Sequence, residues 1–142
     1  MKNTKNADIQ IINMQNNHGE DTKIEFCCEG NFFEKKGVFY LFYTEMTEVG
    51  DTHIRLVAEK DSVKLYRTGA SKATMEYKNG YTYSFHYTVP YGDILMTLHT
   101  FELEQQLDEN GGTIYLRYSL DIQGEIFEND MNITIKTKGT PE

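Results

Sequence analysis

The residues that could carry chemistry are scattered along this chain and form no recognised motif. The histidines lack the spacing of zinc enzymes and the cysteines lack C-x-x-C spacing; these residues are His18, His53, His86, His99, Cys27 and Cys28. Residues 69–73 (GASKA) superficially resemble a nucleophile elbow, but they join two expected strands rather than a strand and a helix, which predicts a hairpin turn. The sequence therefore predicts no catalytic residue, no metal site and no cofactor.

One charged side chain, that of Arg67, is expected to point toward the apolar side of its strand. Arg67 has the parity of Val63 and Leu65, and side chains two residues apart in a strand share a face. In a barrel, an inward Arg either holds the carboxylate of a ligand through a charge-assisted pair or closes one end through an ion pair. We favour the ion pair, because unpaired charges are rarely buried.

His99 and two carboxylates fall in one long expected strand. His99 has the parity of Phe101 and Leu103, so we expect it to be partly buried on their face. Glu102 and Glu104 share the other face. Paired carboxylates perform acid–base chemistry only in a cleft that shifts their pKa values, so a solvated strand edge is the simpler expectation here.

The strongest local signal is an aromatic stripe. Its members, Tyr81, Tyr83, Phe85 and Tyr87, alternate with Thr82, Ser84, His86 and Thr88. Such a stripe fills a core, lines a ligand cavity or forms a subunit contact, and core filling is the commonest of the three. Buried tyrosines need hydrogen-bond partners for their hydroxyls, which favours a partly open interior.

Apolar and polar residues alternate with period two along almost the whole chain, and this pattern predicts strands. Turn signals such as Asn79-Gly80 separate the runs about every ten residues, as in a sandwich or barrel. The expected strands are residues 7–15, 22–29, 37–47, 53–60, 62–68, 72–78, 81–89, 93–107, 113–123 and 131–138. A helical turn within 102–109 is the less favoured alternative.

These strands predict an all-β protein: a single antiparallel, mostly up-and-down β-barrel of about eight to ten strands, because closing the sheet removes its exposed edges. One domain spans residues 1–142, with flexible ends at 1–6 and 139–142. Residues 38–47 are apolar on both faces. This indicates that a terminal segment or a second subunit covers part of the outer surface.

Composition argues against some classes of binding partner and favours one cellular location. The formal net charge of −8 argues against a general affinity for nucleic acid or anionic membranes, which Lys and Arg would have to supply. No apolar run approaches transmembrane length, and the first residues lack the apolar segment of a secretory signal. Adjacent cysteines give no disulfide framework, which fits a reducing compartment. We therefore expect a cytoplasmic protein.

Five segments taken together resemble the YwiB-like family of uncharacterised bacterial proteins. They are residues 38–45 (VFYLFYTE), 63–69 (VKLYRTG), 89–92 (VPYG) and 111–122 followed by 132–135 (NITI). Each is weak alone, but their order and spacing are specific, and the similarity extends over nearly the whole chain. The resemblance implies a calycin-like, lipocalin-type β-barrel and no particular activity. The chain has no Trp and so lacks the Gly-x-Trp signature of lipocalins.

Three hypotheses for function remain open. The first is a cytoplasmic, non-enzymatic barrel that binds a small apolar or amphipathic ligand; its expected ligand-binding residues are Arg67, Tyr81, Tyr83, Phe85, Tyr87 and His99. The second is a structural or interaction module, a homodimer without a ligand. The third, ranked last, is an enzyme at the barrel mouth, which requires His99, Arg67 and a carboxylate to cluster.

Overall fold

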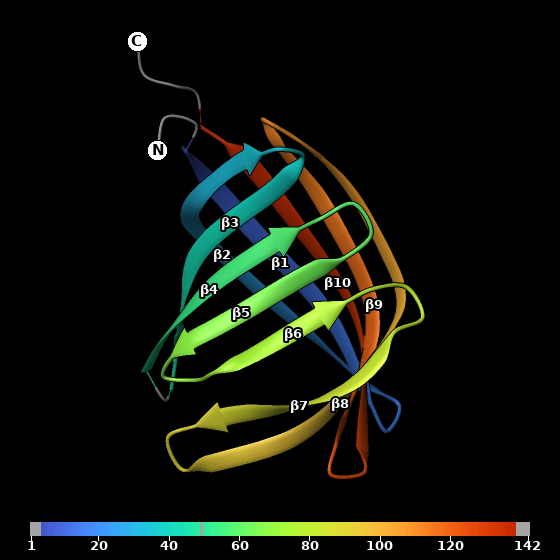
Figure 1. Ribbon diagram of the computed structural model, residues 1–142. Helices are drawn as coiled ribbons and strands as arrows, with labels where there is room; N and C mark the ends of the chain where they lie inside the picture. The colour runs from blue at the N-terminus through green and yellow to red at the C-terminus, as the bar shows by residue number, and fades with distance from the viewer. Residues whose placement is uncertain (1–3, 49, 139–142) are drawn as a thin grey trace.

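The chain folds into ten β-strands that form one continuous antiparallel sheet (Figure 1). The computed structural model describes residues 4–48 and 50–138. The strands are β1 (Lys5–Asn17), β2 (Glu20–Lys35), β3 (Val38–Thr47), β4 (Gly50–Ala58), β5 (Val63–Gly69), β6 (Ala73–Tyr77), β7 (Thr82–Val89), β8 (Gly92–Asp108), β9 (Gly111–Ile122) and β10 (Glu125–Thr137). The predicted all-β fold is confirmed. Within the described ranges, no helix is long and apolar enough to cross a membrane.

The sheet closes on itself as a nearly complete barrel. Its strand order is β6-β5-β4-β3-β2-β1-β10-β9-β8-β7, so chain neighbours pair everywhere except at β6 and β7. The first and last strands join, from Ala7 opposite Thr137 to Asn16 opposite Glu128. Consecutive hairpins place successive strands side by side, which gives the predicted up-and-down order.

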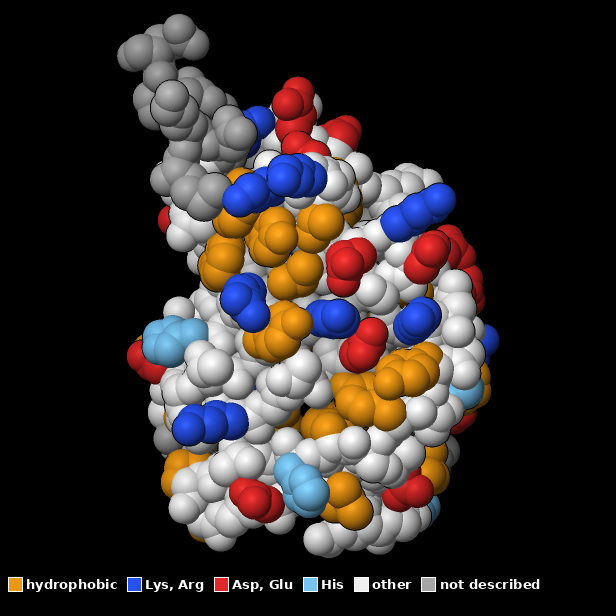
Figure 2. Space-filling view, viewed as in Figure 1, with side chains coloured by type: hydrophobic (Ala, Val, Ile, Leu, Met, Phe, Trp, Pro, Cys, Tyr) orange, Lys and Arg blue, Asp and Glu red, His pale blue; other side chains and the backbone are white. Residues whose placement is uncertain are grey.

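The β6 and β7 strands meet along a seam that lacks a regular ladder. At one end of the seam, Lys72 and Thr88 exchange two backbone hydrogen bonds of 2.8 Å each. Farther along, the Tyr83 hydroxyl accepts a hydrogen bond from the Glu76 N–H and donates one to the Thr74 carbonyl, 2.9 Å away. Figure 2 shows a small hollow between the two strands. A tyrosine of the aromatic stripe thus satisfies backbone groups on the edge of β6.

The position of β10 differs from the prediction. The sequence predicts this strand from residue 131, but it begins at Glu125, after a turn at Gln123 and Gly124 whose φ values are both positive. Asn129 therefore lies within a strand and is buried. Its side-chain oxygen accepts a hydrogen bond of 2.9 Å from the Asn13 amide, which makes a buried polar residue tolerable there.

The terminal segments that the sequence predicts to be flexible are only partly described. Lys5 and Asn6 are strand residues of β1, opposite Phe32 and Asn31 of β2. Strand pairing therefore starts inside the segment 1–6. Residues 1–3 and 139–142 lie outside the described residues.

The barrel interior is packed at one end and half-exposed at the other. We call the end with the loops 36–37, 59–62 and 109–110 the closed end, and the end with the loops 18–19, 90–91 and 123–124 the mouth (Figure 1). Most inward side chains toward the closed end are buried, although Phe39 and Leu107 are only partly buried. The buried ones include Val63, Leu65, Tyr77, Ile114 and Leu116. Inward apolar side chains toward the mouth pack on this core but stay half-buried; they include Ile11, Phe26, Cys28, Phe85, Tyr87 and Leu120.

The mouth opens at a fork where β2 and β3 part. Their pairing extends only from Asn31 opposite Phe42 to Lys35 opposite Val38. A Cβ on Gly30 would lie 2.3 Å from the Phe42 carbonyl oxygen, so only glycine lets the strands cross this closely. Beyond the fork, and within the described part of the chain, residues 20–29 of β2 pair with β1 alone and residues 43–47 of β3 pair with β4 alone.

A β-bulge in β8 places His99 on the outside of the barrel. The register shift between Thr100 and Glu102 inserts Phe101 as an extra residue, so that equal parity no longer means the same face. Leu103 is buried in the core. His99 instead contacts Thr82 and lies edge-on to the Phe101 ring at 4.6 Å. The prediction that His99 shares a face with Leu103 is therefore wrong.

The β3 strand is apolar on both faces, as the sequence indicates. Leu41 lies in the core, whereas Tyr40 and Phe42 point outward, where the Phe33 ring of β2 stacks on them at 4.8 and 5.9 Å. Figure 2 shows hydrophobic patches with Lys and Arg side chains between them on the face formed by the front strands. Phe33 thus packs beside these two rings, and the cover by a terminal segment or a second subunit stays a prediction.

Candidate functional site

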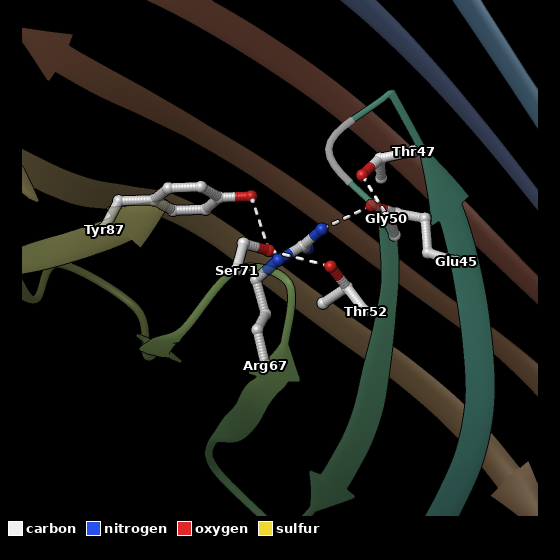
Figure 3. A network of polar contacts seen from close by, with 7 residues as sticks. All are labelled: Glu45, Thr47, Gly50, Thr52, Arg67, Ser71 and Tyr87. Carbon is white, nitrogen blue, oxygen red and sulfur yellow. Dashed lines mark hydrogen bonds and ion pairs between the residues drawn. The ribbon is translucent and has the colours of Figure 1, made fainter. Parts of the chain in front are cut away.

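Arg67 points into the barrel near the mouth, as the parity of β5 predicts. It lies opposite Ile54 of β4 and Ala73 of β6, which are both buried, and only 13% of its own side chain is exposed. Its guanidinium forms an ion pair with Glu45 of β3, whose side chain is 29% exposed (Figure 3). Of the two alternatives for Arg67, the structure shows the ion pair.

Glu45 and Tyr87 stabilise the positive charge of Arg67 inside the barrel. Burial is the largest single influence and would lower the pKa of this guanidinium. The negative charge of Glu45, the neighbouring Tyr87 and the hydrogen bond to Glu45 together outweigh burial, so the Arg67 pKa is raised. The Tyr87 ring centroid lies 5.6 Å from Arg67 Cζ, within cation–π range. Arg67 thus remains a cation in a largely apolar surrounding.

One donor of the Arg67 guanidinium has no acceptor. Its Nε is buried and finds no hydrogen-bond partner within the described part of the chain. Buried donors in native proteins are nearly always paired, and an unpaired one costs free energy. The Nε–H therefore marks a position where a further acceptor would be favourable.

Three hydroxyl groups lie beside the ion pair. Thr52 Oγ1 and Ser71 Oγ are 2.9 Å apart in a buried contact, and the Tyr87 hydroxyl donates to Ser71 at 3.4 Å (Figure 3). Ser71 belongs to the GASKA segment, which forms the predicted turn between β5 and β6. Within the described residues, the Ser71 side chain has the hydroxyls of Thr52 and Tyr87 as hydrogen-bond partners, and the segment joins two strands rather than a strand and a helix.

Aromatic and thiol side chains form the adjoining wall of the mouth. The Phe26 and Tyr43 ring centroids are 6.1 Å apart. Cys28 is half-buried on the inner face, whereas Cys27 is exposed on the outer face. Burial, followed by the negative charges of Cys27 and Glu45, raises the pKa of the Cys28 thiol. Cys28 therefore stays protonated at neutral pH and acts as an apolar group.

The aromatic stripe faces inward, but its members differ in role. Tyr81, which is 36% exposed, stacks on Tyr83, and Tyr83 packs on Phe85; the two ring-centroid distances are 5.2 and 5.5 Å. The Tyr83 hydroxyl seals the seam, and Tyr87 contacts Arg67. Of the six expected ligand-binding residues, the structure brings Arg67, Phe85 and Tyr87 to the inner wall of the mouth and leaves His99 outside.

Sequence reasoning did not single out Glu45 and Thr52. Glu45 has the parity of Tyr43, and Thr52 has the parity of Ile54, so each is a polar residue on the apolar face of its strand near a strand end. This is the signal that identified Arg67. The same test applied to every strand would have found both residues.

The enzyme hypothesis required His99, Arg67 and a carboxylate to cluster. Arg67 meets the carboxylate of Glu45, but His99 lies on the outer face of β8. Glu102 also faces outward, 3.8 Å from Arg117. Within the described residues, the structure therefore does not bring these three groups together.

Replacing Arg67 with Met is expected to lower the free energy of unfolding by about 2 to 3 kcal/mol, because it leaves Glu45 uncompensated in a partly buried position. The double variant E45Q/R67M should lose less than the two single variants together. Arg55→Met is the matched control: Arg55 is exposed and lies over the Tyr66 ring, so its loss should cost less than about 1 kcal/mol. Urea denaturation measures all four variants, and equal losses for R67M and R55M would contradict a stabilising ion pair.

The fold and this site together define an antiparallel β-barrel whose inward apolar side chains are half-buried toward the mouth, where Arg67 and Glu45 form an ion pair. The chain belongs to the family described as Domain of unknown function (DUF1934), whose profile matches residues 9–135.

Two comparisons support this assignment. The chain is 24% identical over 139 residues to the uncharacterized beta-barrel protein YwiB of Bacillus subtilis (strain 168), covering 98% of this chain and 97% of the relative. The crystal structure of the ywiB protein from Bacillus subtilis matches with a TM-score of 0.91 at 22% identity, over 98% of this chain and 96% of that chain. The predicted resemblance and the barrel fold are confirmed.

Proposed function

We propose that this protein binds a small amphipathic anion in the barrel mouth, with its head group at Arg67. The observation that carries the proposal is the buried Nε–H of the inward-pointing Arg67, which has no acceptor within the described residues. A carboxylate or similar oxyanion supplies the missing acceptor and a charge-assisted bond.

The surroundings of Arg67 suit such a ligand. Apolar side chains of the mouth, Phe26 and Leu120 among them, are only half-buried and offer surface to an alkyl chain. The closed end is already filled by side chains, so the ligand would occupy the mouth alone. We place this activity in the cytoplasm, because the free cysteines Cys27 and Cys28 fit a reducing compartment.

Calorimetric titration with decanoate and with decanol tests the proposal. Both share an alkyl chain, but only decanoate offers an acceptor with charge, so the wild type should bind decanoate at least about tenfold more tightly, a difference of about 1.4 kcal/mol. R67M should lose this preference, and R55M should keep it. Glu45→Gln removes the competing carboxylate and should strengthen decanoate binding.

Two results would contradict the proposal. One is a wild type that binds neither compound. The other is an R67M variant, folded by circular dichroism, that still prefers decanoate over decanol by the wild-type factor. The E45Q variant keeps the test decisive if R67M is too unstable to titrate, because an unchanged or weaker affinity for decanoate in E45Q also counts against Arg67 as the anion site.

A further inference from the structure

The β2 strand has a free edge beyond the fork. Residues 20–29 pair with β1 on one side and have no strand neighbour on the other within the described chain. Asn17 and Glu20 flank a two-residue turn and form a hydrogen-bonded pair. The backbone N–H and C=O groups of even-numbered β2 residues therefore bond to β1, and those of odd-numbered residues point away from β1. The backbone groups of Lys23 and Glu25 therefore face the free edge.

Within the described residues, the free edge of β2 lacks the closing contacts found at the other gap in the barrel, which lies between β6 and β7. The seam between β6 and β7 is sealed by the Lys72–Thr88 backbone bonds and by the Tyr83 hydroxyl. Along β2, by contrast, the consecutive residues 20–25 are all exposed, and the β1–β2 ladder has no register shift that would twist the edge away. Natural sheets rarely leave such an edge unpaired unless a partner strand uses it.

The inner side of the free edge is apolar as well as exposed. Ile24 points to the barrel side and is 46% exposed, and Phe26 next to it on the same face is half-buried. A strand added to this edge would pair the free backbone groups and cover Ile24 in the same step. Both features favour an occupant with the same alternation of apolar and charged residues as β2 itself.

We propose that the occupant is a second copy of this chain, joined by antiparallel pairing of the two β2 strands about a two-fold axis at Ile24. In this register Lys23 of one copy lies opposite Glu25 of the other, and the symmetry repeats the pair. Odd-numbered residues then meet odd-numbered residues, so the free backbone groups of both edges face each other. A register with Glu25 on the axis would instead place Glu25 opposite its own copy and Asp21 opposite Glu29.

Charge exchange at the two central positions tests this register. The mass of the wild type, followed by sedimentation over a wide concentration range, should shift from monomer to dimer. Lys23→Glu places an acidic side chain opposite Glu25 of the other copy, and Glu25→Lys places a basic side chain opposite Lys23 of the other copy. Each single variant should therefore dimerise at least about tenfold more weakly, because like charges directly opposite each other are destabilising.

Two combinations of these substitutions should restore the dimer, which makes the test specific to the β2 edge. An equimolar mixture of K23E and E25K chains should form a heterodimer, and the double variant K23E/E25K should recover the wild-type dimer. The Lys23 and Glu25 side chains of one chain are 3.7 Å apart but 57% and 47% exposed, so these variants should fold normally. Glu128→Lys, at an exposed position of β10, is the control that should leave the dimer unchanged.

A wild type that stays monomeric at every concentration would overturn the proposal. The proposal would equally be overturned if both single variants dimerised as tightly as the wild type, or if a mixture of the two failed to associate. The exchanged side chains, Lys23 and Glu25, lie on the outer face and are not among the proposed ligand-binding residues, so a change in decanoate binding does not account for these outcomes.

Discussion

Raising the pH from 10 to 12 is expected to unfold this barrel, because several of its tyrosines are buried where a phenolate cannot be solvated. Burial raises the pKa of Tyr118 from 10.0 to about 12. Burial also raises the pKa values of Tyr43 and Tyr77. All three lie in the core, and the Tyr77 and Tyr118 rings pack edge to face at 4.9 Å.

The direction in which stability changes with pH depends on whether the folded or the unfolded chain holds the proton. Between pH 10 and pH 12 the folded chain keeps a Tyr118 proton that the unfolded chain releases, so stability is complete below pH 10 and falls as the pH rises through 12. Tyr118 alone accounts for roughly 3 kcal/mol of this loss. Burial raises the pKa values of Tyr43 and Tyr77 as well, so both add to the loss in the same direction.

Urea denaturation at a series of pH values measures this loss. Tyr118→Phe should lose less stability than the wild type over the same pH range, because it removes one of the titrating groups. Tyr91→Phe is the matched control, since Tyr91 is 80% exposed, and it should show the wild-type pH dependence. An unfolding free energy that stays constant up to pH 12, or an equal loss of it in Y118F and Y91F, would contradict the raised pKa values of these buried tyrosines.

Replacing Gly30 with Ala is expected to cost about 3 kcal/mol of unfolding free energy. The added Cβ would lie 2.3 Å from the Phe42 carbonyl oxygen and 2.7 Å from Ile9 Cδ1, so β3 would have to move away from β2 at the fork. Because backbone rather than a flexible side chain is in the way, little relaxation is available. The denaturation midpoint of the variant measures the effect.

Gly19→Asn provides the comparison for Gly30. Gly19 lies in the β1–β2 turn with φ +80 and open space around its Cα, and Asn tolerates this conformation. Its replacement should change the unfolding free energy by less than about 1 kcal/mol. If G30A were as stable as G19N, the close crossing that opens the mouth would not exist.

Most strands can be predicted because their signal is local. Alternation in residues such as Ile114, Leu116 and Tyr118 is a property of the segment itself. The start of β10 escapes prediction because Asn129 interrupts the alternation, and its partner Asn13 is supplied by a distant strand. Alternation along the sequence assigns His99 to the wrong face of its strand, because no local sequence pattern indicates the bulge at Phe101.

The site is only half predictable for a similar reason. The inward direction of Arg67 follows from parity, but its pairing with Glu45 depends on how β3 and β5 sit on either side of β4. The fork depends on Gly30, whose role is a close approach to Phe42 rather than a turn or an alternation. The sequence therefore indicates which side chains point inward, and the packing decides which of them meet.

Methyl NMR during a decanoate titration tests most directly whether the barrel has one packed end and one mouth that admits a ligand. Ile11 and Leu120 line the mouth, whereas Val63, Leu65 and Ile114 fill the closed end. The predicted result is saturable shifts at Ile11 and Leu120, with the closed-end methyls unchanged. Shifts at Val63, Leu65 and Ile114, or no saturable shift at any of these methyls, would contradict it.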